Sequence, residues 1–577
     1  MKQRTYTTMR MILLTGLLGC LTLFHVQAQP REKVRPLPGR KDLILVRDGV
    51  SQTPIIVSDT APQATVHAVR ELADCIQKIS GGRPDVLEDR PDEVQHAVWV
   101  GFQPALRERF PNLDFDFQHP EEILLACNGR DLVIAGRDRT FKNNQVEAGT
   151  ANAVYTFLHR YLDVRWLWPG ELGEDIIRRE TIAVPSFTYR FHPPFRRRLF
   201  WPKHPKDWYR RQRMQPPLDS LDFHGGHAYT DWWKKYHEAH PEWFALRGNG
   251  VRTPERWGDK PNPKAVKLCV SNPEVGLQWL HNAEQTLRDN PARRMVSATP
   301  NDGGGFCVCA RCTSLDPDTK RDGRIPLTDR YVTYWNRLAR GLKKRFPDRE
   351  AIVGAYAYAA YKAPPVNEAL EKNIAVAYVG HFPFTSPEAR EREKAEWRAW
   401  AEKAPTLCYR PNLFYFAGGV WGLPEVAMQK TAEDFRFLAH NNCIGMTVDS
   451  IRNVWATQGP QYSLTARMAY QPYQVAESVT AQYYLRGFGD AAKQIKAYWR
   501  KMEKARDSVV SSPGFKPGSS HRYDLLKIFR KVYTDDFLDG AQALLDKAEN
   551  SVADGPKVYS RRVALVRSGL DFTRLLM

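Results

Sequence analysis

The chain has 577 residues, of which 42% are hydrophobic and 26% charged, with 84 Lys and Arg residues against 65 Asp and Glu residues. This length exceeds the roughly 250–300 residues at which a single hydrophobic core stops growing, so the sequence predicts several domains and excludes a small binding module. The composition also excludes a disordered, collagen-like or coiled-coil chain. The net charge of +19 favours acidic partners, which include anionic polysaccharides, anionic lipids and nucleic acids.

The N-terminus has the pattern of a secretory signal peptide, residues 1–28. Three basic residues among the first ten precede an apolar segment, 11–24, and small or β-branched residues precede an expected cleavage site after Ala28. We expect an exported protein, periplasmic or extracellular, with no membrane span, because this segment is shorter than the roughly 20 apolar residues that cross a bilayer. An uncleaved anchor and a lipoprotein modified at Cys20 are the alternatives. Export makes nucleic acid the least favoured acidic partner, and the sequence has no nucleic-acid-binding motif.

Residues 29–190 predict a small N-terminal α/β domain. Apolar residues of 65–79 recur every three or four positions, which predicts an amphipathic helix that ends at Gly81-Gly82. Asn128-Gly129 joins two β-rich segments and predicts a hairpin, because a tight turn there needs positive φ angles. The predicted elements are strands at 43–46, 54–57 and 98–101, a hairpin of 122–126 with 131–135, and helices at 65–79 and 149–162.

Residues 191–473 predict a TIM-barrel-like catalytic domain. The expected strands are 198–201, 267–271, 295–299, 351–359, 374–378, 406–409 and 444–448. Helices alternate with them, and two have clear starts, at Thr328-Asp329 and at Ser386-Pro387. Strands alternating with helices over about 250 residues favour a (β/α)₈ barrel with one strand unrecognised. A doubly wound sheet is less favoured, because no glycine-rich phosphate turn follows an early strand.

Residues 474–577 predict a helical C-terminal domain. The expected helices are 475–485, 491–509, 536–552 and 559–577, and no strand pattern occurs after about residue 473. The predicted fold class is therefore α/β: a (β/α)₈ TIM-like barrel preceded by a small α/β domain and followed by a helical C-terminal domain.

Two acidic residues follow predicted strands at the face of the barrel where enzymes of this fold place reactive groups. Asp302 precedes three glycines, and Asp449 ends a later strand. Glycoside hydrolysis requires two carboxyl groups, one that donates a proton to the leaving oxygen and one that acts as nucleophile or base. We expect Asp302 to be the donor, because its loop could desolvate it and raise its pKa, and Asp449 to be the nucleophile or base. A capping role for either residue is the alternative.

Six polar or aromatic residues near these strand ends are candidates for binding substrate, since sugars are held by aromatic faces and hydrogen-bonding groups. They are His224, His227, Tyr356, Tyr358, His381 and Trp421. Ordinary packing explains each aromatic residue equally well. His224 and His227 could alternatively bind a metal, although no acidic partner lies at a known spacing from them.

Three cysteines follow Asp302 closely, with the spacing Cys307-x-Cys309-x-x-Cys312. In an exported protein disulfides are the default, and Cys269 is the nearest outside partner. A structural zinc ion held by three or four of these thiolates is the alternative, and no other cofactor is expected. Either arrangement would make the loop that carries Asp302 rigid.

Five segments together carry a resemblance to a known family. They are Ala64–Gly82, Ala153–Pro169, His240–Leu246, Leu268–Pro273 and Asn301–Cys312. They resemble a bacterial family of large exported proteins of unknown function. Its N-terminal domain is similar to the non-catalytic α/β domain of α-glucuronidases and β-hexosaminidases, and its middle is similar to a glycosidase barrel. The likeness to α-glucuronidases implies an acidic sugar, but no catalytic motif of either enzyme matches residue for residue.

These patterns together predict a secreted glycoside hydrolase that uses a two-carboxylate mechanism. Its expected substrate is a glycosidic bond in a polysaccharide or oligosaccharide, and acidic glycans are among the candidates. Two other functions stay open. One is a non-catalytic carbohydrate-binding protein on a degenerate barrel, and the other is a metal-dependent hydrolase that uses the histidines.

Overall fold

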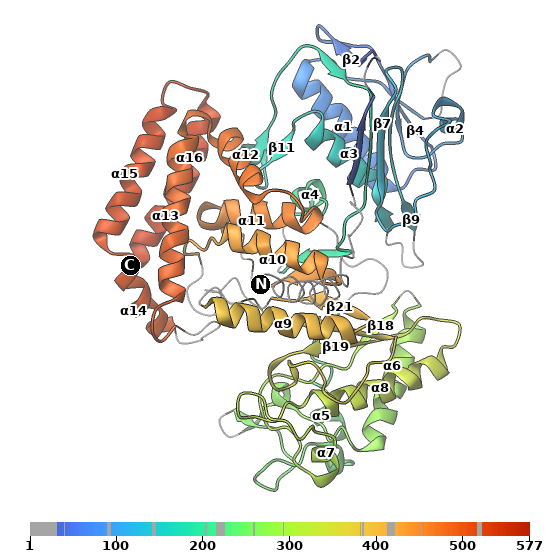
Figure 1. The fold of residues 1–577 in the computed structure, drawn as a ribbon, viewed down its shortest axis with the longest axis vertical. Helices are drawn as coiled ribbons and strands as arrows, with labels where there is room; N and C mark the ends of the chain where they lie inside the picture. Colours follow the sequence, from blue (N-terminus) through green and yellow to red (C-terminus); the bar gives the residue numbers. More distant parts are fainter. Residues whose placement is uncertain are drawn as a thin grey trace, which may run out of the picture.

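The computed structural model describes residues 32–577, except 38, 40, 89–93, 141–145, 202–204, 215–225, 258–259, 292, 381, 383–385, 412–421, 450, 452 and 516–521. The predicted signal peptide and the candidates His224, His381 and Trp421 lie outside the described residues. The described chain forms an N-terminal α/β part, a middle part with a curled parallel sheet and a C-terminal group of helices (Figure 1). The domain boundaries at residues 190 and 473 stay predictions.

The N-terminal part is built on a mixed seven-stranded sheet with the order β1-β14-β7-β8-β6-β4-β5. Its strands are β1 (Glu32–Pro36), β14 (Phe187–Phe191), β7 (Ile123–Cys127), β8 (Leu132–Gly136), β6 (Val98–Val100), β4 (Ile55–Val57) and β5 (Val86–Glu88). Neighbouring strands are antiparallel in the first part of this order, β1-β14-β7-β8, and parallel in the rest, β8-β6-β4-β5. The other strands of this part form three small sheets: β2 (Leu43–Arg47), β3 (Val50–Ser51), β9 (Asp138–Thr140), β10 (Val146–Ala148), β11 (Arg165–Trp166), β12 (Glu174–Asp175) and β13 (Ile182–Val184).

Helices α1 (Gln63–Ser80) and α3 (Gly149–Arg160) pack against one face of this sheet and against each other (Figure 1). The short helix α2 (Leu106–Arg109) contributes to a separate apolar cluster on the opposite face, which includes Trp99. The prediction that the first helix ends at Gly81 is confirmed, since Gly81 has a φ of 87° and donates its backbone N–H to the Gln77 carbonyl. The predicted hairpin is confirmed as β7 and β8, with Gly129 at a φ of 86°.

The middle part contains a curled sheet of six parallel strands with the order β15-β22-β21-β20-β19-β18. The strands are β15 (Arg197–Phe200), β18 (Met295–Ser297), β19 (Ile352–Ala357), β20 (Ile374–Tyr378), β21 (Thr406–Tyr409) and β22 (Cys443–Val448). Six of the seven predicted strands are therefore confirmed. A parallel bridge between His227 and Thr299 extends the sheet beside β18. A closed barrel of eight strands stays a prediction.

The predicted strand at 267–271 is wrong. Only Leu268 forms a bridge there, antiparallel to Phe244. The backbone of Lys267 accepts a hydrogen bond from Ala245, and Cys269 donates one to Trp243. This segment thus pairs locally with residues 243–245 and does not join the parallel sheet.

Helices alternate with the parallel strands, as the sequence predicts. They are α4 (Lys206–Arg211), α5 (Trp232–Tyr236), α6 (Pro273–Asp289), α7 (Ala310–Thr313), α8 (Thr328–Arg345), α9 (Pro387–Lys403) and α10 (Met428–His440), and a two-stranded hairpin, β16 (Arg256–Trp257) with β17 (Lys260–Pro261), lies before α6. The Ser386 side chain accepts the backbone N–H of Ala389 and caps α9 as expected. Helix α8 begins at Thr328, as predicted, and buries one apolar face, Trp335 included.

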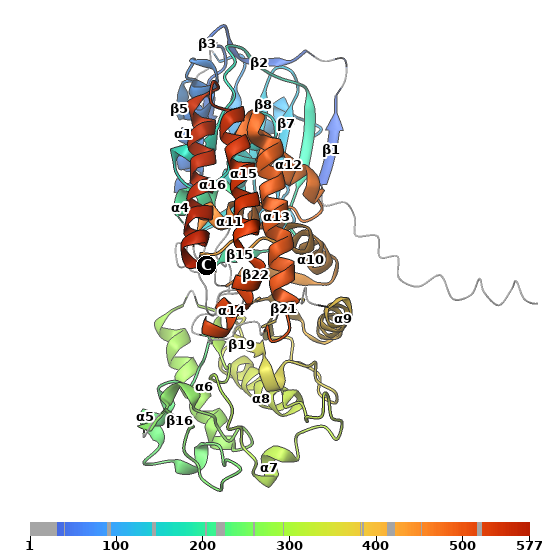
Figure 2. The same ribbon diagram turned by 90° about the vertical axis from the view of Figure 1, so that its left-hand side faces the viewer.

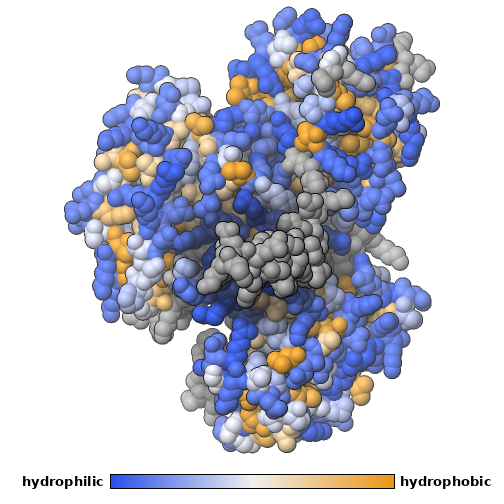
Figure 3. Space-filling model, viewed as in Figure 1, coloured by the Kyte–Doolittle hydropathy of each residue, from blue (hydrophilic) through white to orange (hydrophobic). Residues whose placement is uncertain are grey.

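The C-terminal part consists of helices, which confirms that prediction for the described residues after Tyr473. They are α12 (Ala476–Phe488), α13 (Ala492–Val510), α14 (Arg522–Val532), α15 (Asp535–Ser551) and α16 (Lys557–Leu576). Helix α11 (Trp455–Tyr470) precedes this part. Helices α13, α15 and α16 run side by side (Figure 2). Within the described chain no helix combines the length and apolar character needed to cross a bilayer. The face of the molecule in Figure 3 is mostly hydrophilic, with small separate hydrophobic areas.

A buried ion pair, a partly buried ion pair and a hydrogen bond to the backbone connect the N-terminal part to the other two parts. Arg198 on β15 forms two hydrogen bonds with the Glu121 carboxylate, at 2.9 and 2.8 Å, and both side chains are almost completely buried. Arg486 on α12 lies 2.6 Å from the carboxylate of Asp175, on β12 of the N-terminal part. Arg562 on α16 donates to the Glu174 carbonyl at 2.7 Å. The N-terminal part is thus linked both to the parallel sheet and to the C-terminal helices.

Candidate active site at the strand ends

The two predicted catalytic acids follow strands of the curled parallel sheet. Asp302 lies after β18, and Asp449 follows β22 directly. Tyr358 and Arg410 follow β19 and β21 in the same way. Because all these strands are parallel, their carboxyl ends meet at one edge of the sheet, which is where this class of fold places its ligands.

Asp302 pairs with a predicted substrate-binding residue, His227. The His227 Nε2 atom lies 3.0 Å from Asp302 Oδ2, and its Nδ1 atom donates to the Pro300 carbonyl at 2.7 Å. Both ring nitrogens therefore face acceptors, which fits the protonated imidazolium form. The bridge between His227 and Thr299 brings these residues together, although 75 positions separate them in the sequence.

The charges in this pair differ from the expectation for Asp302. The hydrogen bond from His227 holds the pKa of the Asp302 carboxyl below its usual value of 3.8, although partial burial opposes this. The same hydrogen bond raises the pKa of His227 above its usual 6.5. Since the Asp302 side chain is 62% exposed, burial is too weak to keep it protonated. The raised pKa expected for Asp302 is therefore not found: its pKa is lowered, which favours the carboxylate form, and its role in the reaction stays a proposal.

A buried lysine, Lys267, is hydrogen-bonded to the backbone of the Asp302 loop. Lys267 donates from Nζ to the Asp302 carbonyl at 2.8 Å, and its ammonium lies 5.1 Å from the centroid of the Phe306 ring. Burial lowers the pKa of Lys267 to about 8, while the negative charges of Glu255 and Asp302 oppose this shift. Lys267 thus adds a third polar link to the loop and a positive charge next to the carboxylate.

The glycines after Asp302 allow a close approach of Glu255. A Cβ atom on Gly304 would lie 2.9 Å from Glu255 Oε1, and one on Gly303 would lie 3.3 Å from Glu255 Oε2. Gly303 also has a φ of 88°, which side chains rarely adopt. The backbone at Gly303 therefore requires glycine, whereas a side chain at position 304 would only have to displace the flexible end of Glu255.

Asp449 has a cationic partner of its own. Arg410 Nη2 lies 2.9 Å from Asp449 Oδ2, and the Arg410 guanidinium lies 5.2 Å from the centroid of the Tyr356 ring. The Tyr356 ring in turn lies 6.5 Å from the His227 ring. The charge of Arg410 also contributes to the low pKa of Asp302. Arg410 is therefore near both predicted catalytic acids, which the structure brings to one site.

The two tyrosines of this region have different environments. Tyr356 is buried, so packing against its neighbours accounts for it, whereas Tyr358 is half-buried. Burial raises the pKa of Tyr358, and the negative charge of Asp302 adds to this shift. We define the strand-end cluster as the group formed by Asp302, His227, Tyr356, Tyr358, Arg410 and Asp449.

Sequence reasoning missed Arg410 and Lys267. Arg410 follows the predicted strand 406–409 directly, and a basic residue at that position was a detectable signal. Lys267 was predicted to lie in a strand, and nothing in the sequence indicates that its side chain contacts the Asp302 backbone, 35 residues later. The partner of each acid lies far away in the chain, and no spacing rule reveals it.

The thiols of Cys269, Cys307, Cys309 and Cys312 also come together, next to the Asp302 loop. They form one of two groups of potential metal ligands in the described part of the chain; the other is His240, Glu242 and Glu274. His227 belongs to neither group. All eight cysteines of the described residues are free thiols, so none of these four is in a disulfide in the structure.

The fold places this chain among proteins with glycoside-hydrolase architecture. It is similar to the family GH115 4-O-methyl-α-glucuronidase BtGH115A, with specificity for decorated arabinogalactans, at a TM-score of 0.54 and 13% identity, over 93% of this chain and 73% of that one. It is also similar to CpGH84B, at a TM-score of 0.45 and 12% identity over 94% of this chain and 90% of that one. A third similar structure is the Streptomyces plicatus N-acetyl-β-hexosaminidase, at a TM-score of 0.41 and 14% identity over 82% and 94% of the two chains. At these identities the likeness to BtGH115A bears on the fold and not on the chemistry.

In sequence, no curated protein matches the chain. A family model described as a domain of unknown function, DUF4838, matches residues 168–500. This segment includes the curled parallel sheet, the strand-end cluster and the four clustered cysteines. Because it also spans more than half of the sequence, the chain belongs to the DUF4838 family.

Proposed function

We propose that this protein is a secreted glycoside hydrolase that cleaves a glycosidic bond in an acidic polysaccharide or oligosaccharide. The observation that carries the proposal is the strand-end cluster, in which Asp302 and Asp449 share the neighbourhood of Arg410. In this proposal the curled sheet serves as an incomplete (β/α)₈ barrel. The choice of an acidic sugar rests on the cationic groups of the cluster; BtGH115A, which this chain resembles in fold, is itself named as a 4-O-methyl-α-glucuronidase.

The charges of the cluster suggest the role of each acid. Asp302 acts as nucleophile or base, because His227 holds it in the ionised form. The proton for the leaving oxygen then comes from Asp449. A substrate carboxylate that binds the Arg410 guanidinium in a bidentate manner would displace Asp449 from it.

The surroundings of the cluster favour an anionic ligand. His227, Lys267 and Arg410 bring three positive charges to the strand ends, beside Asp302 and Asp449. Tyr358 is half-buried and offers an aromatic face and a hydroxyl, the groups that proteins use to hold sugar rings. The net charge of +19 acts in the same direction over longer distances.

Product release from a panel of glycans tests this function. We expect sugar release from glycans that carry uronic acids and little from neutral glycans of similar linkage. Arg410→Gln should raise KM for the acidic substrate by about tenfold or more, because a charge-assisted pair is worth about 1.5–3 kcal/mol. Binding without product release on every glycan would instead indicate a carbohydrate-binding protein, and activity confined to neutral glycans would exclude the acidic substrate.

The pH dependence of turnover tests the pairing of Asp302 with His227. The pair is intact above the lowered pKa of Asp302 and below the raised pKa of His227, so activity should fall as the pH rises through the latter, above 6.5. The stability that His227 contributes is present below 6.5 and is lost over the same rise. A pH–rate profile of His227→Gln should lose the part of the basic limb that comes from His227, since glutamine does not titrate. An unchanged basic limb in that variant would exclude His227 as its source.

A further inference from the structure

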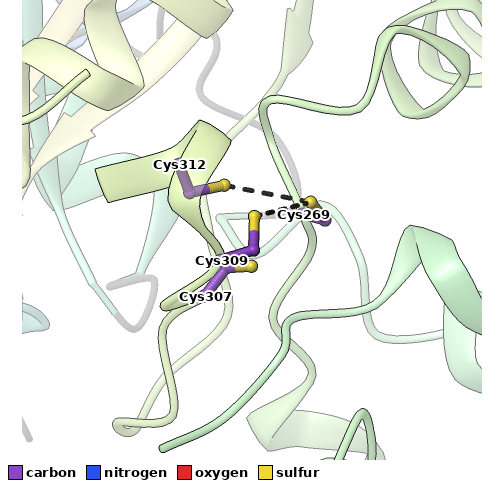
Figure 4. A group of neighbouring side chains, drawn as sticks. All are labelled: Cys269, Cys307, Cys309 and Cys312. Carbon is purple, nitrogen blue, oxygen red and sulfur yellow. Dashed lines mark hydrogen bonds between the residues drawn. The ribbon is translucent and has the colours of Figure 1, made fainter. Parts of the chain in front are cut away.

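The sulfur atoms of Cys269, Cys307, Cys309 and Cys312 converge on one point, as Figure 4 shows. Cys269 comes from the segment that pairs with residues 243–245, and the other three come from the loop after Asp302 and from α7. The four Sγ atoms all lie within 4.8 Å of one another. The Cys269 sulfur is 3.7 Å from that of Cys309 and 3.9 Å from that of Cys312.

These separations are those of thiolates around a single metal ion. Four sulfurs at about 2.3 Å from a tetrahedral Zn²⁺ ion lie about 3.8 Å from one another. A disulfide would instead bring two of the sulfurs to about 2.05 Å and leave the other two apart. An iron–sulfur cluster does not fit, because its inorganic core occupies the space between its thiolates and holds them farther apart.

The surroundings of the cluster match a closed structural site. Three of the four cysteines are buried, and Cys309 is half-buried. The Leu246 backbone N–H donates to Cys307 Sγ at 3.3 Å, and the Ser271 hydroxyl oxygen lies 3.1 Å from Cys312 Sγ. In the structure Cys312 Sγ donates to the Ser271 oxygen, and once Cys312 gives up its proton to bind a metal ion, the Ser271 hydroxyl can donate in return; together with the Leu246 N–H it would partly neutralise the negative charge of four thiolates. Four protein ligands leave no open position, so the ion would not take part in catalysis.

We propose that Cys269, Cys307, Cys309 and Cys312 bind one structural zinc ion that fixes the Asp302 loop. The ion joins residues 307–312 to Cys269, only two residues from Lys267, which donates to the Asp302 carbonyl. The backbone adds two further links, since Val308 donates to the Leu246 carbonyl and Cys269 donates to the Trp243 carbonyl. Zinc would thus connect two segments of little regular structure, both of which hydrogen-bond to residues 243–246, and its binding energy would stabilise them.

Metal analysis of the full chain, purified without chelator, tests the proposal. We expect one zinc ion per chain and all eight cysteines of the described residues as titratable thiols once the protein is denatured with a chelator. Replacement of zinc by Co²⁺ should give the absorption spectrum of a tetrahedral four-thiolate site. Protein that contains no zinc and has disulfides among these four cysteines, found by mass spectrometry after alkylation, would overturn the proposal.

A matched pair of variants locates the zinc ion. Cys309→Ser changes the most accessible ligand and should lose the stoichiometric zinc, with a lower Tm. Cys75→Ser changes a buried free thiol on α1, outside the cluster, and should keep it. Full zinc content in Cys309→Ser would contradict the assignment. If this variant does not fold, the absorption spectrum of the unchanged protein loaded with Co²⁺ shows whether four thiolates bind the metal. None of these measurements depends on glycosidase activity, so the two proposals can fail separately.

Discussion

Replacing Asp302 by asparagine is expected to lower kcat/KM on the glycan identified by the panel by about 10²–10⁴-fold, the usual contribution of a positioned acid–base group. Asparagine keeps the shape of the side chain but cannot act as nucleophile or base. The Asp302 side chain is 62% exposed, and the loop is held through the Asp302 backbone by Lys267, so the variant should fold normally. Initial rates and Tm, measured on the same preparations, separate the loss of chemistry from a loss of structure.

Asp539→Asn is the matched control for this substitution. Asp539 on α15 is 69% exposed and pairs with a single cation, Arg574, at 2.9 Å, outside the strand-end cluster. The control should therefore keep full activity. If Asp302→Asn also kept full activity, Asp302 would have no part in the mechanism.

An activated substrate distinguishes the roles of the two acids. The leaving group of an activated aryl glycoside departs without being protonated. Asp449→Asn should therefore retain much more activity on such a substrate than on the natural glycan. Asp302→Asn should be inactive on both substrates, because neither can react without the nucleophile or base. The opposite pattern would exchange the two roles.

Arg198→Met is expected to destabilise the protein by about 3–5 kcal/mol, the loss found when one partner of a buried ion pair is removed. The Arg198 side chain is fully buried and that of Glu121 is 2% exposed, and the carboxylate has one more polar contact, from the Asn152 amide at 2.8 Å. Methionine fills part of the volume but leaves the Glu121 charge without its cation. The free energy of unfolding in the first denaturant transition measures the effect.

Two comparisons make this prediction specific. The double variant Arg198→Met with Glu121→Gln removes the uncompensated charge and should recover part of the loss. Arg574→Met removes a surface pair and should change stability by less than about 1 kcal/mol. A loss in Arg198→Met no larger than in Arg574→Met would show that the buried pair does not hold the N-terminal part against the parallel sheet.

Elements with local signals in the sequence were predicted well. The end of α1 depends on Gly81 and the β7–β8 turn on Gly129, and each glycine supplies the positive φ angle that its position needs. Helix α11 was missed for an equally local reason. Nearly all of its residues are buried and Pro460 lies inside it, so it has neither a polar face nor a clean helical pattern.

The site itself depended on contacts between distant residues. The positions of Asp302 and Asp449 after strands were enough to select them as candidates, and the structure brings both to the region of Arg410. The direction of the Asp302 pKa shift is opposite to the one expected, because the shift comes mainly from His227, whose position beside β18 depends on a single bridge. The apolar residues around Lys267 have the composition of a strand and were predicted as one. Composition does not show which backbone segment they pair with, and in the structure it is residues 243–245.

The pairing of β15 with β22 also constrains the order of folding. The Arg197 side chain on β15 donates to the Thr447 hydroxyl on β22, 250 residues later, and the backbones pair between the same strands. The seven-stranded N-terminal sheet, in contrast, needs no residue beyond Phe191. During synthesis, that sheet can therefore form early, while β15 stays without its partner strand until β22 has been made. This interval is the stage at which a chaperone, or an aggregating neighbour, would most readily capture the chain.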